Sequence, residues 1–130
     1  MTPVEIQRAF DVFLSSWTTT SIRWMSQAAP ALPYIEPHLL LGDVVGLEIG
    51  GVAERTGIAQ INIFTVMTAG DIQGLTYGGS LESMFWHQQS GKLFFENGDQ
   101  MPSTYKSGID EARQAYHFIT KIPFNIITEY

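Results

Sequence analysis

Residues 57–86 read GIAQINIFTVMTAGDIQGLTYGGSLESMFW, and this stretch decides the fold. From Ala59 to Ile63 apolar side chains alternate with polar ones, a period of two that is typical of a strand covered on one face. Phe64 and Val66 then indicate that both faces become buried toward the end of the strand. The stretch therefore predicts the central strand of a sheet.

A helix is predicted to follow this strand. Gly70 breaks the chain, and the Asp71 carboxylate is expected to cap the helix by accepting hydrogen bonds from its first amides. The helix should end near Trp86 and lie back over the sheet. Within it, Gly74, Gly78 and Gly79 each cost about 1 kcal/mol of helix stability relative to alanine.

Two explanations of these glycines stay open. The first is a close approach of the helix to the sheet, with Leu81, Met84 and Phe85 as the buried side chains. The second is a ligand-binding loop over residues 70–79. That segment only loosely resembles a phosphate-binding loop, because it lacks the lysine and hydroxyl residue that hold phosphate and magnesium.

The length and composition of the chain limit the possible functions. Its 130 residues predict a single domain, 1–130, whose stability comes from its core, since the chain has no cysteine. The formal net charge of −6 disfavours nucleic-acid binding, which needs a basic surface. No apolar run is long enough to span a membrane, and the N-terminus lacks the basic start of a signal peptide, so a soluble cytoplasmic product is expected.

The low charge of the chain favours a protein partner. Charged residues make up 15% of the chain and apolar residues 45%, so neutral or apolar surface must remain exposed. The alternative is a monomer with a rather neutral surface.

An N-terminal helix is predicted from residue 3 onward. Thr2 and Glu5 have the spacing of a capping box, and Pro3 suits the first helical position. An apolar stripe then recurs at helical spacing from Ile6 to Trp17, where the helix is expected to end.

A hairpin of two long strands is predicted next. Residues 20–25 favour a short strand, and residues 28–37 an ordered loop because they contain three prolines. Residues 38–49 predict a strand that is interrupted by a bulge or twist at Gly42 and Gly46. This strand should pair antiparallel with the central strand, because a parallel return needs a longer crossover.

The last third of the chain predicts a smaller hairpin and a closing strand. Residues 91–95 and 103–106 are expected to be strands on either side of the turn at residues 97–99, so that this region projects. Residues 116–126 alternate as one long strand, and Pro123 predicts that it lies at a sheet edge or bulge.

Side chains able to do chemistry are scattered. His38, His87 and His117 are far apart, and none has a second ligand at metal-binding spacing. Ser80 follows Gly79 but lacks the second glycine of a nucleophile elbow. We therefore predict no catalytic residue, no metal site and no cofactor.

The carboxylates also have ordinary explanations. Asp43 and Glu48 are five residues apart in a predicted strand, which places them on opposite faces unless a bulge intervenes. Asp110 and Glu111 are interpreted as loop charges with Arg113 as the only basic neighbour. The sequence does not predict an enzyme.

The order of these features resembles the tail terminator proteins of long-tailed bacteriophages. The shared pattern covers most of the chain and consists of a capped N-terminal helix, an early strand, a proline-bearing loop, a long hairpin, a glycine-started helix and an aromatic closing strand. In this sequence these features include Ile22-Arg23-Trp24, Arg55 to Ile63, Gly70 with Leu81 and Phe85, and Tyr116 to Phe124.

The resemblance implies an α+β fold with the two helices packed on a mainly antiparallel, twisted sheet. It also implies a virion protein that assembles as a hexameric ring on the tail tube, ends tube growth and joins the head-completion or connector protein. DNA would pass through the lumen without specific binding, and no membrane, catalytic residue or cofactor is implied.

Candidate interface residues come from the projecting hairpin and the proline-bearing loop, where function is often located. They are Tyr34, Phe94, Phe95, Asn97 and Tyr105. Replacing Phe94 or Phe95 with Asp is expected to abolish the ring and leave the monomer folded. The alternatives are another phage neck, head-completion or minor tail protein, or a small-molecule-binding α+β domain that uses residues 70–79 as its pocket.

Overall fold

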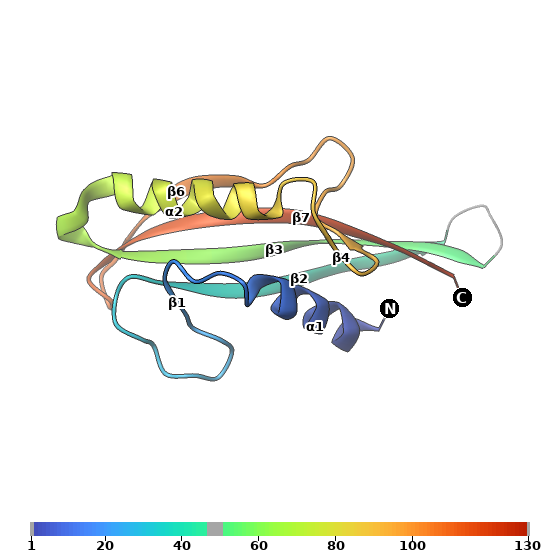
Figure 1. The fold of residues 1–130 in the computed structure, drawn as a ribbon, viewed down its shortest axis with the longest axis horizontal. Coiled ribbons are helices and arrows are strands. Elements are labelled where there is room, and N and C mark those ends of the chain that lie inside the picture. The colour runs from blue at the N-terminus through green and yellow to red at the C-terminus, as the bar shows by residue number, and fades with distance from the viewer. Residues whose placement is uncertain (1, 47–50, 130) are drawn as a thin grey trace.

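The structure is a computed structural model that describes residues 2–46 and 51–129. Two helices pack on a seven-stranded sheet, which confirms the predicted α+β class (Figure 1). The elements are α1 (Pro3–Leu14), β1 (Ser21–Ile22), β2 (Tyr34–Gly46), β3 (Val52–Val66), the 3₁₀ turn η1 (Met67–Ala69), α2 (Gly70–Phe85), β4 (Gln89–Ser90), β5 (Leu93–Phe94), β6 (Ser103–Asp110) and β7 (Ala115–Glu129).

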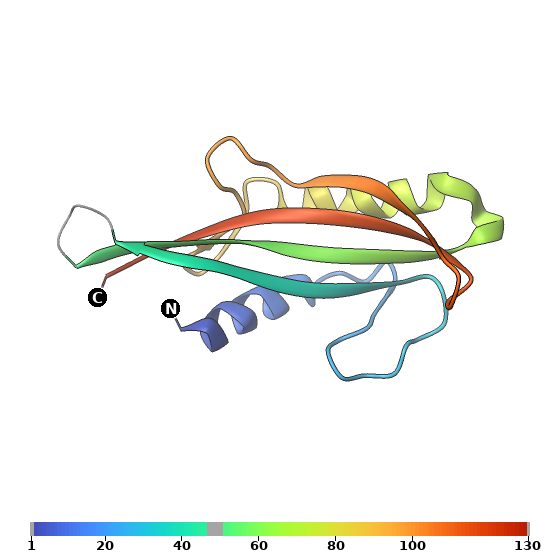
Figure 2. The same ribbon diagram turned by 180° about the vertical axis from the view of Figure 1, so that it is seen from behind.

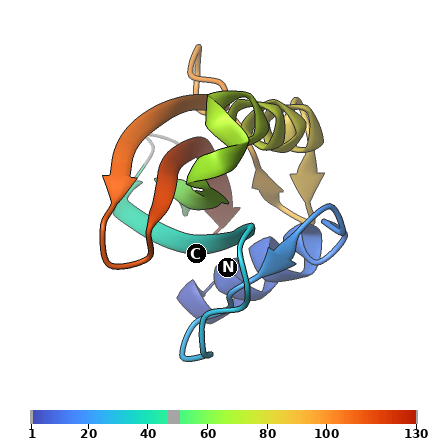
Figure 3. The same cartoon turned by 90° about the vertical axis from the view of Figure 1, so that its left-hand side faces the viewer.

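The sheet is mainly antiparallel, as predicted. Its strand order is β1-β2-β3-β7-β5-β4, and β6 pairs with β7 beside β5. Only the short β1–β2 pair is parallel among the described pairs. Viewed end-on, the sheet is curled and both helices lie on the same side of it (Figure 3).

Strand β3 is the central strand that the sequence predicts, although it starts at Val52, earlier than expected. It pairs with β2 on one side and with β7 along its full length on the other. Ala59, Ile61 and Ile63 are fully buried toward the helices. The alternation from Ala59 to Ile63 therefore separates the helix-covered face from the other face of the sheet.

Strand β7 carries the predicted apolar face, but it is not at an edge. Phe118, Ile122 and Phe124 are fully buried in the core. On the side opposite β3, the ladder partners of β7 stop at Lys121 and resume at Asn125. Pro123 lies in this gap between β6 and β5, so its missing N–H leaves no broken ladder on that side.

Helix α1 begins as predicted and ends earlier. The Thr2 hydroxyl accepts from the Glu5 N–H at 3.2 Å, and the Glu5 carboxylate accepts from the Thr2 N–H at 3.0 Å, which completes the capping box. The helix ends at Leu14 because Ser15 and Ser16 turn the chain, and their hydroxyls donate to carbonyls of the last turn. Trp17 lies beyond the helix and is still buried.

The prediction that Asp71 caps helix α2 is wrong. The helix begins at Gly70 with Ala69 as its N-cap, and no side chain caps it. Asp71 instead accepts a hydrogen bond from Lys106 Nζ at 2.8 Å, because the first turn of α2 lies beside β6. The helix ends at Phe85, one residue before Trp86, close to the predicted position.

The glycines of α2 are explained by its packing on the sheet. A Cβ atom on Gly74 would lie 2.0 Å from the Phe118 ring, and one on Gly78 would lie 2.3 Å from Thr104. Leu81 and Phe85 are buried on the same side of the helix. These contacts favour the close-approach interpretation of residues 70–79 over a ligand loop.

The predicted small hairpin is wrong. Strand β5 pairs with β4 and β7, and β6 pairs with β7, so residues 91–95 and 103–106 are not partners. The long strand β7 supplies a hydrogen-bonding edge that each segment uses separately. The turn itself is present, because Asn97 and Gln100 exchange backbone hydrogen bonds and Gly98 has a φ of 59°.

The β1–β2 region also differs from the prediction. Strand β1 covers two residues rather than residues 20–25, and β2 begins at Tyr34, inside the expected loop. The β2–β3 pairing is antiparallel with a register shift between Leu41 and Val44, which confirms the bulge near Gly42. Glu48 lies outside the described residues, so its relation to Asp43 is not described.

The main core joins both helices to one face of the sheet. The rings of Phe10 in α1 and Phe85 in α2 stack with their centroids 5.9 Å apart, and Phe95 meets Phe85 edge-on at 4.7 Å. Phe13 contacts both Phe85 and Phe95. This aromatic cluster links the two helices over one face of the sheet, and within the described residues the other face has no helix.

Candidate assembly surface

The helix-free face of the sheet is the face opposite the main core. Phe64 lies on it, in register with Tyr34 of β2 and His117 of β7. Tyr34, Phe64 and Ala115 form a small second core there. Figure 2 shows the long strands β2, β3 and β7 from behind, where their ends extend past α1.

An apolar patch lies on the helix-free face toward this extended end. It is formed by large side chains that are 37–59% exposed: Leu40, Val45, Ile58, Phe94 and Ile127. The register joins them, because Leu40 pairs with Ile58 across β2–β3, and Glu54 pairs with both Val45 and Ile127. Cross-strand partners project from the same face, so these side chains form one surface.

Three of the candidate interface residues are accessible. Phe94 belongs to the apolar patch and pairs with Asn125 of β7. Tyr105, 44% exposed, pairs with Ile119, which places it on the same face but six β7 residues away, roughly 20 Å. Asn97 is partly buried in its turn.

Tyr34 and Phe95 are wrong as interface residues. Phe95 has no exposed surface, because the side chains of β5 and its continuation alternate and Phe95 points into the aromatic core. Tyr34 is 2% exposed and its ring contacts Phe64 at 5.2 Å. Both side chains stabilise the chain itself.

Arg113 covers one end of the helix-free face. It lies in the β6–β7 turn, and its guanidinium sits 4.4 Å from the Phe64 ring centroid. Its Nε donates to the Tyr34 hydroxyl at 2.8 Å, and it forms ion pairs with Asp110 and with Glu36, the latter at 3.6 Å. The sequence shows only the neighbouring Asp110, because Tyr34 and Glu36 are brought in by folding.

The charges around Arg113 are paired with one another. The Arg113 N–H donates to the Asp110 carboxylate and lowers the pKa of Asp110 below its ordinary value. Glu36 also accepts from Arg23 at 3.3 Å and contacts His38 Nε2 at 3.0 Å. The network holds the β6–β7 turn against the sheet, which is a structural role.

The other histidines also have structural contacts. His117 stacks on Phe64 at 4.8 Å, its Nε2 lies 3.0 Å from Asn62 Oδ1, and burial lowers its pKa. His87 lies 3.4 Å from Glu96 in a mostly exposed pair. Within residues 2–46 and 51–129, no three histidine or acidic side chains are grouped as metal ligands would be.

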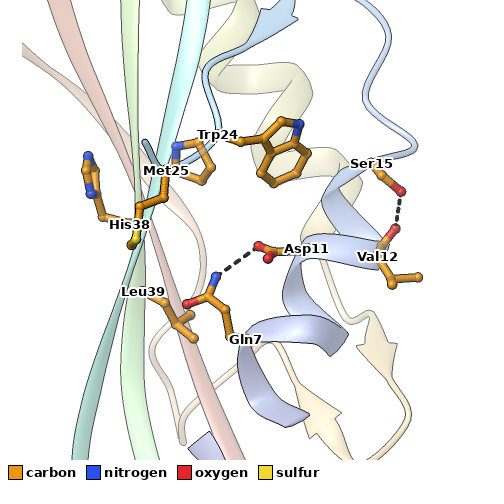
Figure 4. A pocket seen from close by; sticks show the side chains of 9 residues that line it. Gln7, Asp11, Val12, Ser15, Trp24, Met25, His38 and Leu39 are labelled. Atoms are coloured by element: carbon orange, nitrogen blue, oxygen red, sulfur yellow. Dashed lines mark hydrogen bonds between the residues drawn. The ribbon is translucent and has the colours of Figure 1, made fainter. Parts of the chain in front are cut away.

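A groove lies between α1 and β2 on the helix-covered side, with a volume of about 630 Å³ (Figure 4). Trp24, Met25 and Leu39 contribute apolar side chains, whereas Gln7 and Asp11 contribute polar ones from α1. Gln7 Nε2 donates to Asp11 Oδ1 at 2.9 Å, so these two polar side chains of the groove are already hydrogen-bonded to each other. The groove runs beside the outer edge of β2.

These features define a small α+β protein with a helix-covered sheet face and a largely open one that carries an apolar patch. In the described part of the chain, no helix combines the length and apolar character needed to cross a bilayer.

Comparison with known proteins supports the fold alone. No protein-family model and no curated protein matches the chain. Among the solved structures that share the fold is a protein whose name states no function. It superposes with a TM-score of 0.71 at 18% identity and covers 100% of this chain and 98% of its own.

Proposed function

We propose that this chain is a tail terminator protein of a long-tailed bacteriophage. It assembles as a hexameric ring on the last ring of the tail tube, ends tube growth and presents a surface to the head-completion or connector protein. Its role is structural: it presents binding surfaces to its partners and uses no catalytic residue and no cofactor. The protein acts in the virion after synthesis in the bacterial cytoplasm.

The observation that carries this proposal is the apolar patch on the helix-free face. Side chains such as Leu40 and Val45 remain more than half exposed, although the chain has a large hydrophobic core that buries other aliphatic side chains of the sheet. Grouped exposed apolar residues mark surfaces that contact other proteins. Aromatic residues are enriched in such contacts and charges are depleted, which fits Phe94 and the 15% charge of the chain.

The arrangement of secondary structure also supports the proposal. A capped first helix, a long antiparallel hairpin, a central helix and an aromatic closing strand are all present in the order that the family resemblance requires. The acidic balance, 13 acidic against 7 basic residues, fits a lumen through which DNA slides without binding.

The small-molecule alternative loses its expected site. Residues 70–79 belong to α2, and the spaces beside Gly74 and Gly78 are filled by Phe118 and Thr104. A head-completion or minor tail protein remains the nearest alternative, since it would also need an apolar contact surface.

A capping assay tests the proposed function. Purified tail tube protein of the phage that encodes this chain is allowed to polymerise with and without the chain, and tube lengths are measured by electron microscopy. We expect shorter tubes with a ring at one end. Equal length distributions with and without the chain would refute the proposal, and binding to the connector alone would identify a head-completion protein.

Two variants sharpen this assay. Phe94→Asp places a charge in the apolar patch and should restore tube growth, while its circular dichroism spectrum stays unchanged. Thr19→Asp changes an exposed loop residue outside the patch and should cap tubes like the unaltered chain.

A further inference from the structure

The sheet has two long open edges. Strand β1 pairs only with Tyr34 and Ile35, so from Pro37 to Gly46 strand β2 has β3 on one side and no described strand on the other. Strand β6, with 8 residues, has β7 on one side and no described strand beyond it. Such edges present unpaired N–H and C=O groups that can accept another strand.

Each open edge has apolar surface beside it on the helix-covered side. The groove with Trp24, Met25 and Leu39 lies next to β2 (Figure 4). Beside β6 is the flank of α2 that carries Leu75, which is 49% exposed.

The position of this α2 flank follows from helix geometry. Asp71 is bonded to Lys106 of β6, and Leu75 is one turn further along the same side of the helix. Leu75 therefore lies toward the outer edge of β6 and away from α1, whereas Ile72, about 100° further round the helix than Asp71, projects away from the sheet. One edge of the sheet thus has a hollow beside it and the other has a projection.

We propose that the β2 edge of one copy pairs with the β6 edge of a second copy. The two sheets become continuous, and Leu75 of the second copy enters the groove beside β2. This inference specifies the contact between neighbouring copies in the proposed ring. It rests on the proposed function, because that function requires the ring to close. A contact between two different patches is the kind that generates rings, because the pair of copies still has one free β2 edge and one free β6 edge.

A second copy fits these edges better than an unrelated peptide. A peptide on β2 would leave the β6 edge unpaired and Leu75 exposed, whereas pairing β2 with β6 covers both. The polar groups on the helix-covered side are paired within each copy, Asp11 with Gln7 and Lys106 with Asp71, so the groove of one copy and the α2 flank of the other meet without an unpaired charge among these four side chains. Pairing two β2 edges would instead place two grooves together and leave both β6 edges unpaired.

Cysteine cross-linking tests the pairing, because the chain has no cysteine of its own. Leu40→Cys places a thiol near the β2 edge, and Tyr105→Cys places one on β6. Both side chains project from the helix-free face and are 56% and 44% exposed. In a continuous sheet they lie on the same side, and a bismaleimide with a flexible spacer of about 20 Å can join them across a register difference of about five residues, because each residue adds about 3.3 Å along a strand.

The two single variants are treated with the cross-linker separately and as an equal mixture, on assembled tail tubes and at high protein concentration. We expect a cross-linked dimer in the mixture and little in either variant alone. The double variant should form a ladder of higher oligomers. Lys92→Cys, in the exposed β4–β5 turn, is the matched control and should cross-link with neither variant.

Other outcomes would overturn the inference. A dimer from Leu40→Cys alone would show β2–β2 pairing, and cross-links to Lys92→Cys would place the contact at the β4–β5 end. Cross-links only to tube protein would mean that the edge serves a different partner, and their complete absence in a ring seen by microscopy would exclude the pairing.

The experiments distinguish a failure of this inference from a failure of the proposed function. If the chain caps tubes but cross-links by another pair, only the edge pairing is wrong. If the mixture cross-links as expected but tubes grow unchanged, the ring contact stands and tail termination is wrong.

Discussion

Replacing Gly74 by alanine tests the packing of α2 on the sheet. The added Cβ would lie 2.0 Å from Cε2 of Phe118, whereas carbon atoms in contact are about 3.5–4.0 Å apart. The ring would have to move by more than 1 Å by this comparison. Phe118 is fully buried, so little space is available for such a shift.

The size of the effect follows from two opposing terms. Alanine favours the helix over glycine by about 1 kcal/mol. Forcing an extra methyl group into a filled core costs about 1–3 kcal/mol, and the severe overlap here favours the upper end. We expect Gly74→Ala to lower the free energy of unfolding by about 1–2 kcal/mol.

Gly79→Ala is the matched control. It has the same change in helix propensity, but nothing lies within 4 Å of the added Cβ. This variant should be more stable by about 0.5–1 kcal/mol. The two alanine variants should therefore differ by about 1.5–3 kcal/mol.

Urea unfolding followed by circular dichroism measures the difference, with equal m-values required for a direct comparison. In thermal unfolding, each kcal/mol should correspond to about 4 °C in a domain of this size. If Gly74→Ala is as stable as Gly79→Ala, the close approach of α2 to Phe118 is wrong and the glycines need another explanation.

Three further predictions concern the two neighbouring phenylalanines of β5 and its continuation, the pH dependence of stability and the N-terminal cap of α1. Phe95→Asp should unfold the chain, because it buries a carboxylate among aromatic rings, whereas Phe94→Asp, at a side chain that is 38% exposed, should leave the chain folded and lower its melting temperature by about 4 °C at most; thermal melts distinguish the two. Burial lowers the pKa of His117 from 6.5, so the unfolded chain binds the proton more readily and stability should fall as the pH drops below about 6.5; His117→Gln should flatten that part of the pH profile of urea unfolding. Thr2→Ala removes the capping hydroxyl and should destabilise the chain by about 1 kcal/mol by the same method, whereas Thr2→Ser should not.

Local patterns in the sequence were sufficient for the main elements. The alternation around Ile61 placed the central strand, and the hydroxyl and carboxylate of Thr2 and Glu5 placed the start of α1. Both patterns involve residues only a few positions apart, so they can be recognised in the sequence without knowledge of the fold. The same holds for the bulge near Gly42.

Predictions that depended on distant partners were less successful. Phe94 and Phe95 are adjacent and chemically identical, and only the pairing of β5 with β7 decides which of them is exposed. Pro123 indicated an edge strand, but the gap between β6 and β5 accommodates it inside the sheet. Asp71 is a good capping residue by type, yet Lys106 is close enough to bind it.

The candidate surface shows the same division. Composition indicated exposed apolar area, because a chain with 15% charged residues cannot cover itself with charge. It did not indicate where that area lies. Leu40 and Ile58 become neighbours through the β2–β3 register, and Ile127 joins them through β7.

The sequence by itself determined the two helices, the three long strands, the α+β class and the apolar character of the chain, since these follow from local periodicity, capping and composition. Tertiary structure alone decided which aromatic residues form the core, that both helices cover one face, and that β2 and β6 keep open edges. The physical reason is that side-chain burial and strand edges are set by contacts between residues far apart in the chain, and a local pattern is compatible with several such arrangements.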